Sequence, residues 1–561
     1  MFKPTQFSVF FLLIFFCLSL GGSAENNEGR QIFISSYEIT EQNVGTIPNI
    51  DVRQTAKKMK FGQMRMQFPG YINDIIVADF NGDGYDDIAV IDYKDDIRVF
   101  KGNKNLKFKQ VFKRNFAEAG SDFAPPADYN NDGKLDIVTT NSSDNKYISV
   151  FLGKGNGKFK RKPRSVPVRE DYNEFDPIRI RYMQNFNFDG DKRTDIIAFR
   201  DKGDFMVFRN RGRGKFNVSI HQTGRVFCYA MTAADYTGDN LDDCFVYHFN
   251  SGDICFYHNN GDKTFTRAYR MERDDAICNL YTADLNNDGK PDYISDGYWV
   301  FSGFQSDWAR AHTMLGKGNG TLIKKKNFPD EGRLTYGATF NDFNGDNKLD
   351  IAAAQYSGIN VYPGRGTGKF KKPTILGNGL HITPKGNVVW KNNIASGDFN
   401  GDGKVDIIGA QFFRVNTSYD SNIMVFLNGG KASSLKISDL LIETLQYNIT
   451  SNTILFKGSF NYSGNNIELR YDQNLQSPMD SAFMEFKVDF ETSSDSKTEY
   501  SAVYYATGEF LSKPGSYSGK IDFNFELQIS KTLTNFPQEI NLSDFSLYDY
   551  NLVRSNILLE D

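Results

Sequence analysis

Short apolar runs alternate with polar stretches along most of this chain, in an order that repeats. Small residues precede an acidic stretch, as in Ile76-Val77-Ala78, and an apolar run such as Ile88–Ile91 follows it. A third run closes on glycine, as in Val99–Gly102, and a fourth opens on Lys-Phe-Lys, as in Lys107–Lys109. Helical periodicity is absent. Each unit therefore predicts four short antiparallel strands.

The unit occurs seven times, with successive starts 48 to 59 residues apart. A repeat of this length, made of four strands, is typical of a propeller blade. We therefore predict an all-β protein whose residues 59–430 form a seven-bladed β-propeller. The second position of every acidic stretch is large and apolar, which suits a residue wedged between blades: Phe80, Tyr129, Phe188, Tyr236, Leu285, Phe343 and Phe399.

The acidic stretch has the spacing of a calcium loop. In Asp79–Asp87, oxygen-bearing side chains occupy places one, three, five and nine, and Gly84 holds the sixth place, where the backbone must turn. Calcium takes six to eight oxygen ligands, and a tight loop can direct alternate residues toward one point. We expect the seventh residue to contribute its backbone carbonyl. Up to seven structural Ca²⁺ ions are predicted as the cofactor.

The candidate ligands fall at the same five places in each loop. They are Asp79, Asn81, Asp83, Tyr85 and Asp87; Asp128, Asn130, Asp132, Lys134 and Asp136; Asn187, Asp189, Asp191, Arg193 and Asp195; Asp235, Thr237, Asp239, Leu241 and Asp243; Asp284, Asn286, Asp288, Lys290 and Asp292; Asp342, Asn344, Asp346, Lys348 and Asp350; and Asp398, Asn400, Asp402, Lys404 and Asp406. The third loop begins with Asn187 and has Lys192 in place of glycine, so we expect the weakest site there.

The remaining segments complete a picture of an exported protein. Residues 1–24 read as a signal peptide, with Lys3, an apolar core and Gly22-Ser23-Ala24. Residues 25–58 are a polar lead-in, and a strand near 59–66 is expected to complete the last blade and close the ring. Residues 431–561 alternate between apolar and polar positions, which predicts a β-sandwich-like domain. No transmembrane segment is expected.

Four insertions, near 163–184, 296–311, 373–395 and 411–422, lie in connections that share the face opposite the acidic loops. Extra loop length on one face of a rigid ring is where a binding surface is expected.

The cysteines, the net charge and the histidines bear on disulfide formation, nucleic-acid binding and catalysis, respectively. Cys228, Cys244, Cys255 and Cys278 would remain after export and suggest disulfides, with buried thiols as the alternative. The formal net charge of −4 gives no reason to expect a nucleic-acid partner. The five histidines are scattered, and we predict no catalytic residues.

The loop pattern Asp-x-Asn-x-Asp-Gly-x-x-Asp, followed by Gly-x-Gly-x-Phe at Gly155–Phe159 and Gly366–Phe370, resembles the FG-GAP/VCBS repeat family. That family includes the propeller of integrin α subunits and many secreted propellers. The resemblance implies Ca²⁺ on one face of the ring and ligands on the other, with lectin-like or adhesive roles.

We expect a secreted, extracellular calcium-binding propeller that recognises a glycan or protein ligand in adhesion or carbohydrate binding. The alternatives are an extracellular carbohydrate-active enzyme, of lyase or dehydratase type, and a structural coat component.

Overall fold

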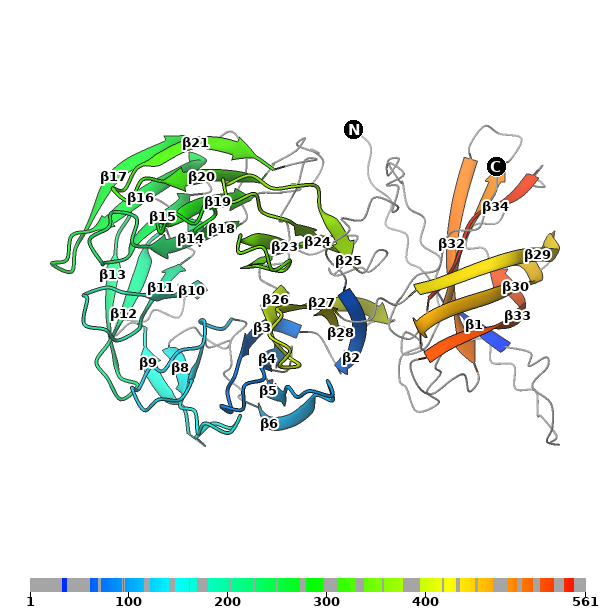
Figure 1. Cartoon of the computed structure of the whole chain (residues 1–561), viewed down its shortest axis with the longest axis horizontal. Helices are drawn as coiled ribbons and strands as arrows, with labels where there is room; N and C mark the ends of the chain where they lie inside the picture. The colour runs from blue at the N-terminus through cyan, green and yellow to red at the C-terminus, as the bar shows by residue number, and fades with distance from the viewer. Residues whose placement is uncertain are drawn as a thin grey trace, which may run out of the picture.

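The computed structural model describes residues 33–37, 61–68, 72–92, 94, 96–115, 122–140, 147–160, 162–168, 180–200, 203–224, 228–248, 251–272, 279–296, 311–328, 337–355, 358–376, 394–415, 418–429, 434–448, 453–467, 483–491, 497–507, 515–528 and 539–548. Its elements are strands, arranged as a ring of blades and a pair of C-terminal sheets (Figure 1). The proposed signal peptide lies outside these residues.

Seven antiparallel sheets form the ring, as predicted. Blade one contains β3 (Ile72–Ala78), β4 (Asp87–Asp92), β5 (Asp96–Lys101) and β6 (Lys109–Asn115). Blade two contains β7 (Ile137–Thr140), β8 (Tyr147–Phe151) and β9 (Arg164–Pro167), with bridges from Phe123 and Ala127 in place of an inner strand. Blade three contains β10 (Ile180–Phe186), β11 (Asp195–Arg200), β12 (Phe205–Asn210) and β13 (Phe216–His221).

The later blades repeat this order. Blade four contains β14 (Cys228–Ala234), β15 (Asp243–His248), β16 (Asp253–Asn259) and β17 (Phe265–Glu272). Blade five contains β18 (Asn279–Ala283), β19 (Asp292–Asp296), β20 (His312–Gly316) and β21 (Leu322–Asn327). Blade six contains β22 (Ala338–Asn341), β23 (Asp350–Gln355), β24 (Gly358–Tyr362) and β25 (Thr374–Leu376).

The N-terminal strand closes the ring. Blade seven has β26 (Ile394–Gly397), β27 (Asp406–Val415) and β28 (Ser418–Asn428), and its outer strand is β2 (Phe61–Phe68). The β2–β28 register runs antiparallel from Phe61 opposite Asn428 to Phe68 opposite Ser421. Residues from the two ends of the propeller thus share one sheet, which confirms the expected closure.

One predicted insertion becomes regular structure. Residues near 411–422 extend β27 and β28 into a long hairpin that pairs as far as Val415 and Ser418. The insertions near 163–184, 296–311 and 373–395 lie largely outside the described residues.

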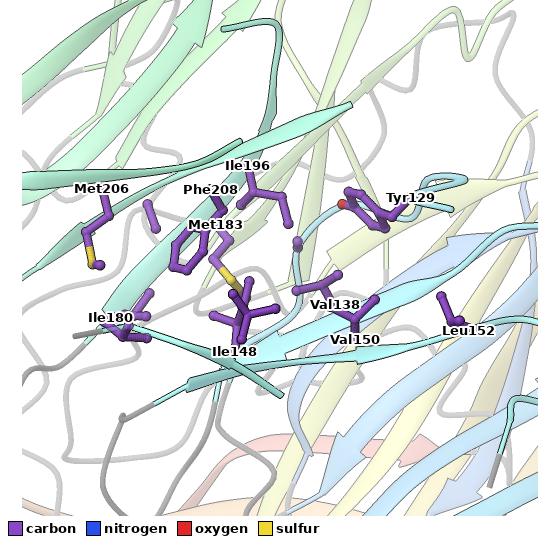
Figure 2. Packing of buried hydrophobic residues seen from close by; sticks show 14 residues of the cluster. Tyr129, Val138, Ile148, Val150, Leu152, Ile180, Met183, Ile196, Met206 and Phe208 are labelled. Atoms are coloured by element: carbon purple, nitrogen blue, oxygen red, sulfur yellow. The ribbon is translucent and has the colours of Figure 1, made fainter. Parts of the chain in front are cut away.

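The core of the ring is divided among the interfaces between blades. Each buried cluster draws on two adjacent blades, and the described clusters account for all seven interfaces. Figure 2 shows the cluster between blades two and three, where Tyr129, Val138 and Val150 from blade two lie near Met183, Ile196 and Phe208 from blade three. The wedge residues behave as predicted, since the least buried of them are only 3% exposed.

The wedge residues also connect blades through their backbone. The carbonyl of Phe80 accepts the N–H of Gly157 from the next blade at 3.1 Å, and that of Tyr236 accepts the N–H of Gly320 at 2.7 Å. In other blades an asparagine side chain donates the hydrogen bond to the carbonyl of the wedge residue. Asn428 Nδ2, for example, donates to Phe343 O at 2.7 Å. Each loop is therefore bonded to its neighbour as well as to its own blade.

The C-terminal residues form two sheets, in agreement with a β-sandwich-like domain. One contains β29 (Ser434–Asn448), β30 (Thr453–Ile467) and β33 (Gly515–Gln528). The other contains β31 (Phe483–Glu491), β32 (Lys497–Thr507), β34 (Glu539–Tyr548) and β1 (Phe33–Tyr37). The interpretation of residues 25–58 as a polar lead-in was therefore incomplete, because β1 lies within them and pairs antiparallel with β32.

Closure by β2 leads to a test. A chain that begins at residue 70 lacks β2 and leaves the edge of β28 unpaired, so we expect a lower melting temperature and self-association through that edge. A chain that begins at residue 59 keeps β2 and serves as the control, since both truncations lack β1. Adding a peptide of residues 59–69 should raise the melting temperature of the shorter chain. Equal melting and equal monomer content of the two chains would contradict a closing role for β2.

Candidate metal-binding loops

The seven acidic loops occupy equivalent places, between the first and second strands of each blade. In blade one, β3 ends at Ala78 and β4 begins at Asp87, and these two residues face each other in the register. Because the strands alternate in direction, the turns between third and fourth strands lie at the same face as the loops. The connections between second and third strands lie at the opposite face, with those that lead to the next blade.

The backbone of each loop is left-handed at the fourth and sixth places. In blade one, Gly82 has φ of 72° and Gly84 has φ of 83°. In blade three, the sixth residue, Lys192, has φ of 64°, a conformation that costs a non-glycine residue about 1–2 kcal/mol. The turn at the sixth place was predicted from the sequence and that at the fourth was not, although glycine or asparagine stands at the fourth place in every loop.

The first aspartate organises this turn from inside. Asp79 Oδ1 accepts the N–H groups of Gly82 at 2.7 Å and Asp83 at 3.2 Å, and Oδ2 accepts that of Gly84 at 2.8 Å. The other loops that begin with aspartate use both oxygens in the same way. Asn187 has a single carboxamide oxygen, which accepts the N–H of Gly190 at 3.0 Å. Blade three therefore begins its loop with a weaker acceptor.

The ninth aspartate is fully buried in every blade. Its Oδ1 accepts the N–H of a residue at the end of the third strand, over 2.6–2.9 Å: Gly102, Gly153, Asn210, Asn259, Gly316, Gly364 and Asn428. In blades three, five, six and seven its Oδ2 accepts the N–H of the wedge residue, over 2.8–3.2 Å. One side chain thus joins the loop, the second strand and the third strand.

Burial in the loop disfavours the charged form of this carboxylate. Desolvation raises the pKa of Asp292 and Asp350 to about 6 and that of Asp406 to about 7. The carboxylates at the first and fifth places raise it further, since like charges repel. A divalent cation bound near them would offset both costs.

The loops therefore supply oxygen donors and excess negative charge that suit Ca²⁺. Within the described part of the chain, however, no three Asp, Glu, His or Cys side chains are close enough together to hold a metal ion by themselves. A bound ion would also require the third-place amide or hydroxyl oxygen and the seventh-place carbonyl. The side chains at place seven are not candidate ligands. The carbons of Lys134 lie beside Gly155 and those of Lys290 lie beside Gly318, in the turns between third and fourth strands.

The neighbours of the loops differ from blade to blade. We use the term flank position for the residue just before the N–H donor to the ninth aspartate. It is occupied by Lys101, Leu152, Arg209, His258, Leu315, Pro363 and Leu427 in blades one to seven. Lys101 Nζ lies 2.6 Å from Asp83 Oδ2, Arg209 pairs with Asp189, and His258 Nδ1 lies 2.8 Å from Asp243 Oδ1. The flank position was not predicted from the sequence.

Comparison with known families agrees with this geometry. The model of the FG-GAP-like repeat matches residues 79–139, 187–246, 235–295 and 342–409, and each match begins at the first residue of an acidic loop. The chain is an FG-GAP-repeat β-propeller.

The solved structures that match this FG-GAP propeller do so at low sequence identity and low TM-score. An Agrocybe aegerita lectin, solved to explain recognition of non-reducing terminal N-acetylglucosamine, is 19% identical with a TM-score of 0.37, and the match covers 64% of this chain and 96% of the lectin. The BBS1N–ARL6DN complex soaked with mercury matches at 10% identity and a TM-score of 0.42, covering 65% of this chain and 96% of the other. No curated protein matches the sequence. The described residues include no helix long and apolar enough to cross a membrane.

A cavity of about 320 Å³ lies along the inner strands of the FG-GAP propeller. Its lining comes from blades one, two, three, six and seven and includes Asp74, Tyr182, Gln184, Thr339 and Ser396. Several of these groups link adjacent inner strands. Asp74 Oδ2 accepts the N–H of Phe123 at 2.8 Å, and the hydroxyls of Thr339 and Ser396 lie 2.7 Å apart. The described lining contains a single tyrosine and neither histidine nor arginine.

The three cysteines that the structure describes form no disulfide with one another. Cys228, Cys244 and Cys255 are buried thiols, which was the alternative that the sequence left open. They belong to the cluster between blades three and four, and Cys244 lies opposite Tyr257 whereas Cys255 lies opposite Val246. The strand register thus keeps these two sulfur atoms from facing each other directly. Cys278 lies outside the described residues.

The ninth aspartate can be tested without any metal. We expect Asp350→Asn, measured in the presence of chelator, to lower the free energy of unfolding by about 3 kcal/mol. The amide retains one acceptor but presents its NH₂ group to the backbone N–H of Gly364 or Phe343, which leaves a buried donor unsatisfied. Asp346→Asn at the half-buried fifth place is the control and should change stability by less than about 1 kcal/mol. Urea denaturation measures both, and equal effects would show that the ninth aspartate does not hold the strands together.

Proposed function

We propose that this FG-GAP propeller is a secreted recognition module, stabilised by calcium, that binds a glycan or an extracellular protein. The observation that carries the binding role is the axial cavity, lined by both polar and apolar groups, inside a ring whose blades are fixed by closure and by interblade bonds. Residues 1–24 would be removed on export, and mass spectrometry of the exported protein would show whether it begins near Glu25.

The cavity favours recognition over catalysis. Its carboxylate, Asp74, accepts the backbone N–H groups of Ile75 and Phe123, so it serves to hold two inner strands. The hydroxyls of Thr339 and Ser396, with the aromatic ring of Tyr182, can bind a hydroxyl-rich ligand such as a sugar through hydrogen bonds and packing. The hairpin of β27 and β28 and the other insertions would extend the binding surface on the face opposite the acidic loops.

Calcium would act on structure. An ion held by the first, third, fifth and ninth side chains would neutralise a carboxylate that the fold buries in every blade. Outside cells, loops with affinities of only about 10⁻⁴–10⁻³ M would be filled.

Chelation tests the calcium role. A single site at a hundredfold excess of ligand over its Kd adds about 2.7 kcal/mol to stability, so loss of calcium from several loops should lower the melting temperature by about 5 °C or more. Differential scanning calorimetry in EDTA, and again after calcium is restored, measures this change. Magnesium at the same concentration is the control. A melt that is the same in EDTA and in calcium would contradict bound structural calcium.

A substitution in the cavity tests the binding role. A glycan array and a panel of extracellular proteins, each probed with and without calcium, would identify the ligand. We then expect Ser396→Phe, which fills the axial cavity, to weaken binding at least tenfold. Ser165→Phe on the exposed face of β9 is the matched control and should leave affinity unchanged. Unchanged affinity in a folded Ser396→Phe protein would place the ligand elsewhere.

A further inference from the structure

Two loops of the propeller form a natural matched pair. Asp79–Gly84 in blade one and Asp398–Gly403 in blade seven share the six residues Asp-Phe-Asn-Gly-Asp-Gly. Their backbones bond alike: the fourth N–H donates to the first aspartate at 2.7 Å in both, and the sixth N–H at 2.8 Å in both. They differ at the seventh place, which holds Tyr85 in blade one and Lys404 in blade seven, and at the flank position, which holds Lys101 in blade one and Leu427 in blade seven. Lys404 lies beside Gly429, in the turn after the third strand.

Lys101 occupies the place where a metal ion would find its ligands. Its Nζ lies 2.6 Å from Asp83 Oδ2 and 3.1 Å from Asn81 Oδ1. These are the side-chain oxygens of the fifth and third places. An ammonium group and a divalent cation that share the same two oxygens would repel each other strongly, so they cannot both be bound there.

Blade seven has no such competitor at its flank position. Leu427 packs with the apolar cluster between blades seven and one. The oxygen of Asn400 accepts the N–H of Asp402 at 2.9 Å. In blade seven the flank residue therefore supplies no cation to the same six loop residues.

Blade three uses two arginines to the same effect. Arg209 at the flank position pairs with Asp189, and Arg193 at the seventh place pairs with Asp191. Both acidic residues at the third and fifth places are thus neutralised by guanidinium groups. The loop also begins with the uncharged Asn187, so less negative charge remains for an ion.

We propose that cationic side chains of the protein itself occupy the acidic loops of blades one and three, Lys101 in blade one and Arg193 with Arg209 in blade three. These two loops then do not bind calcium. The propeller then binds at most five Ca²⁺ ions. This inference rests on the proposed structural role of calcium and determines which loops take part in it.

The remaining blades keep their third and fifth places available. Leucine or proline holds the flank position in blades two, five, six and seven. In blade four, His258 contacts the ninth aspartate, Asp243, and leaves the third and fifth places to other partners. In blade six, Lys348 Nζ lies 3.7 Å from Asp346 Oδ2, beyond hydrogen-bonding distance, whereas Lys101 Nζ lies 2.6 Å from Asp83 Oδ2. Lys348 is therefore the weaker competitor for an incoming ion.

Exchanging the two flank residues tests the proposal. Equilibrium dialysis with radioactive calcium, followed by a protein assay, counts the ions bound at saturation. We expect no more than five per wild-type chain, one more for Lys101→Leu and one fewer for Leu427→Lys. The double variant should return to the wild-type count. Lys101→Arg is the control that keeps the positive charge, and it should gain no ion.

Stability provides a second measurement. In chelator, Lys101→Leu should melt below the wild type because Asp83 loses its cation, and calcium should restore the melting temperature. A wild-type count of seven, or no added ion in a folded Lys101→Leu protein, would overturn the inference while leaving calcium as a structural ion. A wild-type chain that binds no calcium would instead overturn the calcium role, and Lys101→Leu with no ion would then overturn the inference as well.

Discussion

The fold depends on a buried carboxylate that must find backbone N–H partners. The ninth aspartate of each loop has no access to water, so its charge is tolerated only because backbone segments donate N–H groups to it. The end of the third strand does so in every blade, and the wedge residue also does so in blades three, five, six and seven. In blade six those segments are the end of the third strand at Gly364 and the wedge residue Phe343. Since the wedge residue also packs against the next blade, the geometry of one carboxylate is transmitted to the interface.

This arrangement explains how the propeller holds together as one ring although its described core is divided among the interfaces between blades. Hydrophobic burial is divided among separate interfaces, and each is completed only when both flanking blades are in place. Backbone hydrogen bonds between neighbouring blades, such as that from Gly157 N–H to Phe80 O, fix how the two blades are aligned. Apolar packing alone is not directional. Around the axis, polar pairs such as Thr339 and Ser396 join the inner strands without filling the cavity.

The blades and their interfaces could be predicted from the sequence because the seven repeats can be aligned with one another on their acidic loops. The acidic spacing located seven hairpins, and the large residue at Phe80 and its equivalents marked the interfaces. The flank position was missed because Lys101, Leu315 and Leu427 share no residue type, and only the structure shows that they occupy the same place. The thiols were misjudged because an even count of cysteines says nothing about register. β1 was missed because its partner, β32, lies more than four hundred residues away.

The position of β2 has a consequence for biosynthesis. The strand that leaves the ribosome first among the propeller residues pairs with one of the last, so Phe61 must wait until Asn428 has been synthesised. Contacts of such long range make folding slow, and strand edges stay exposed in the meantime. During the synthesis of residues 69–428, β2 therefore lacks β28, and its edge is open to pairing with other chains.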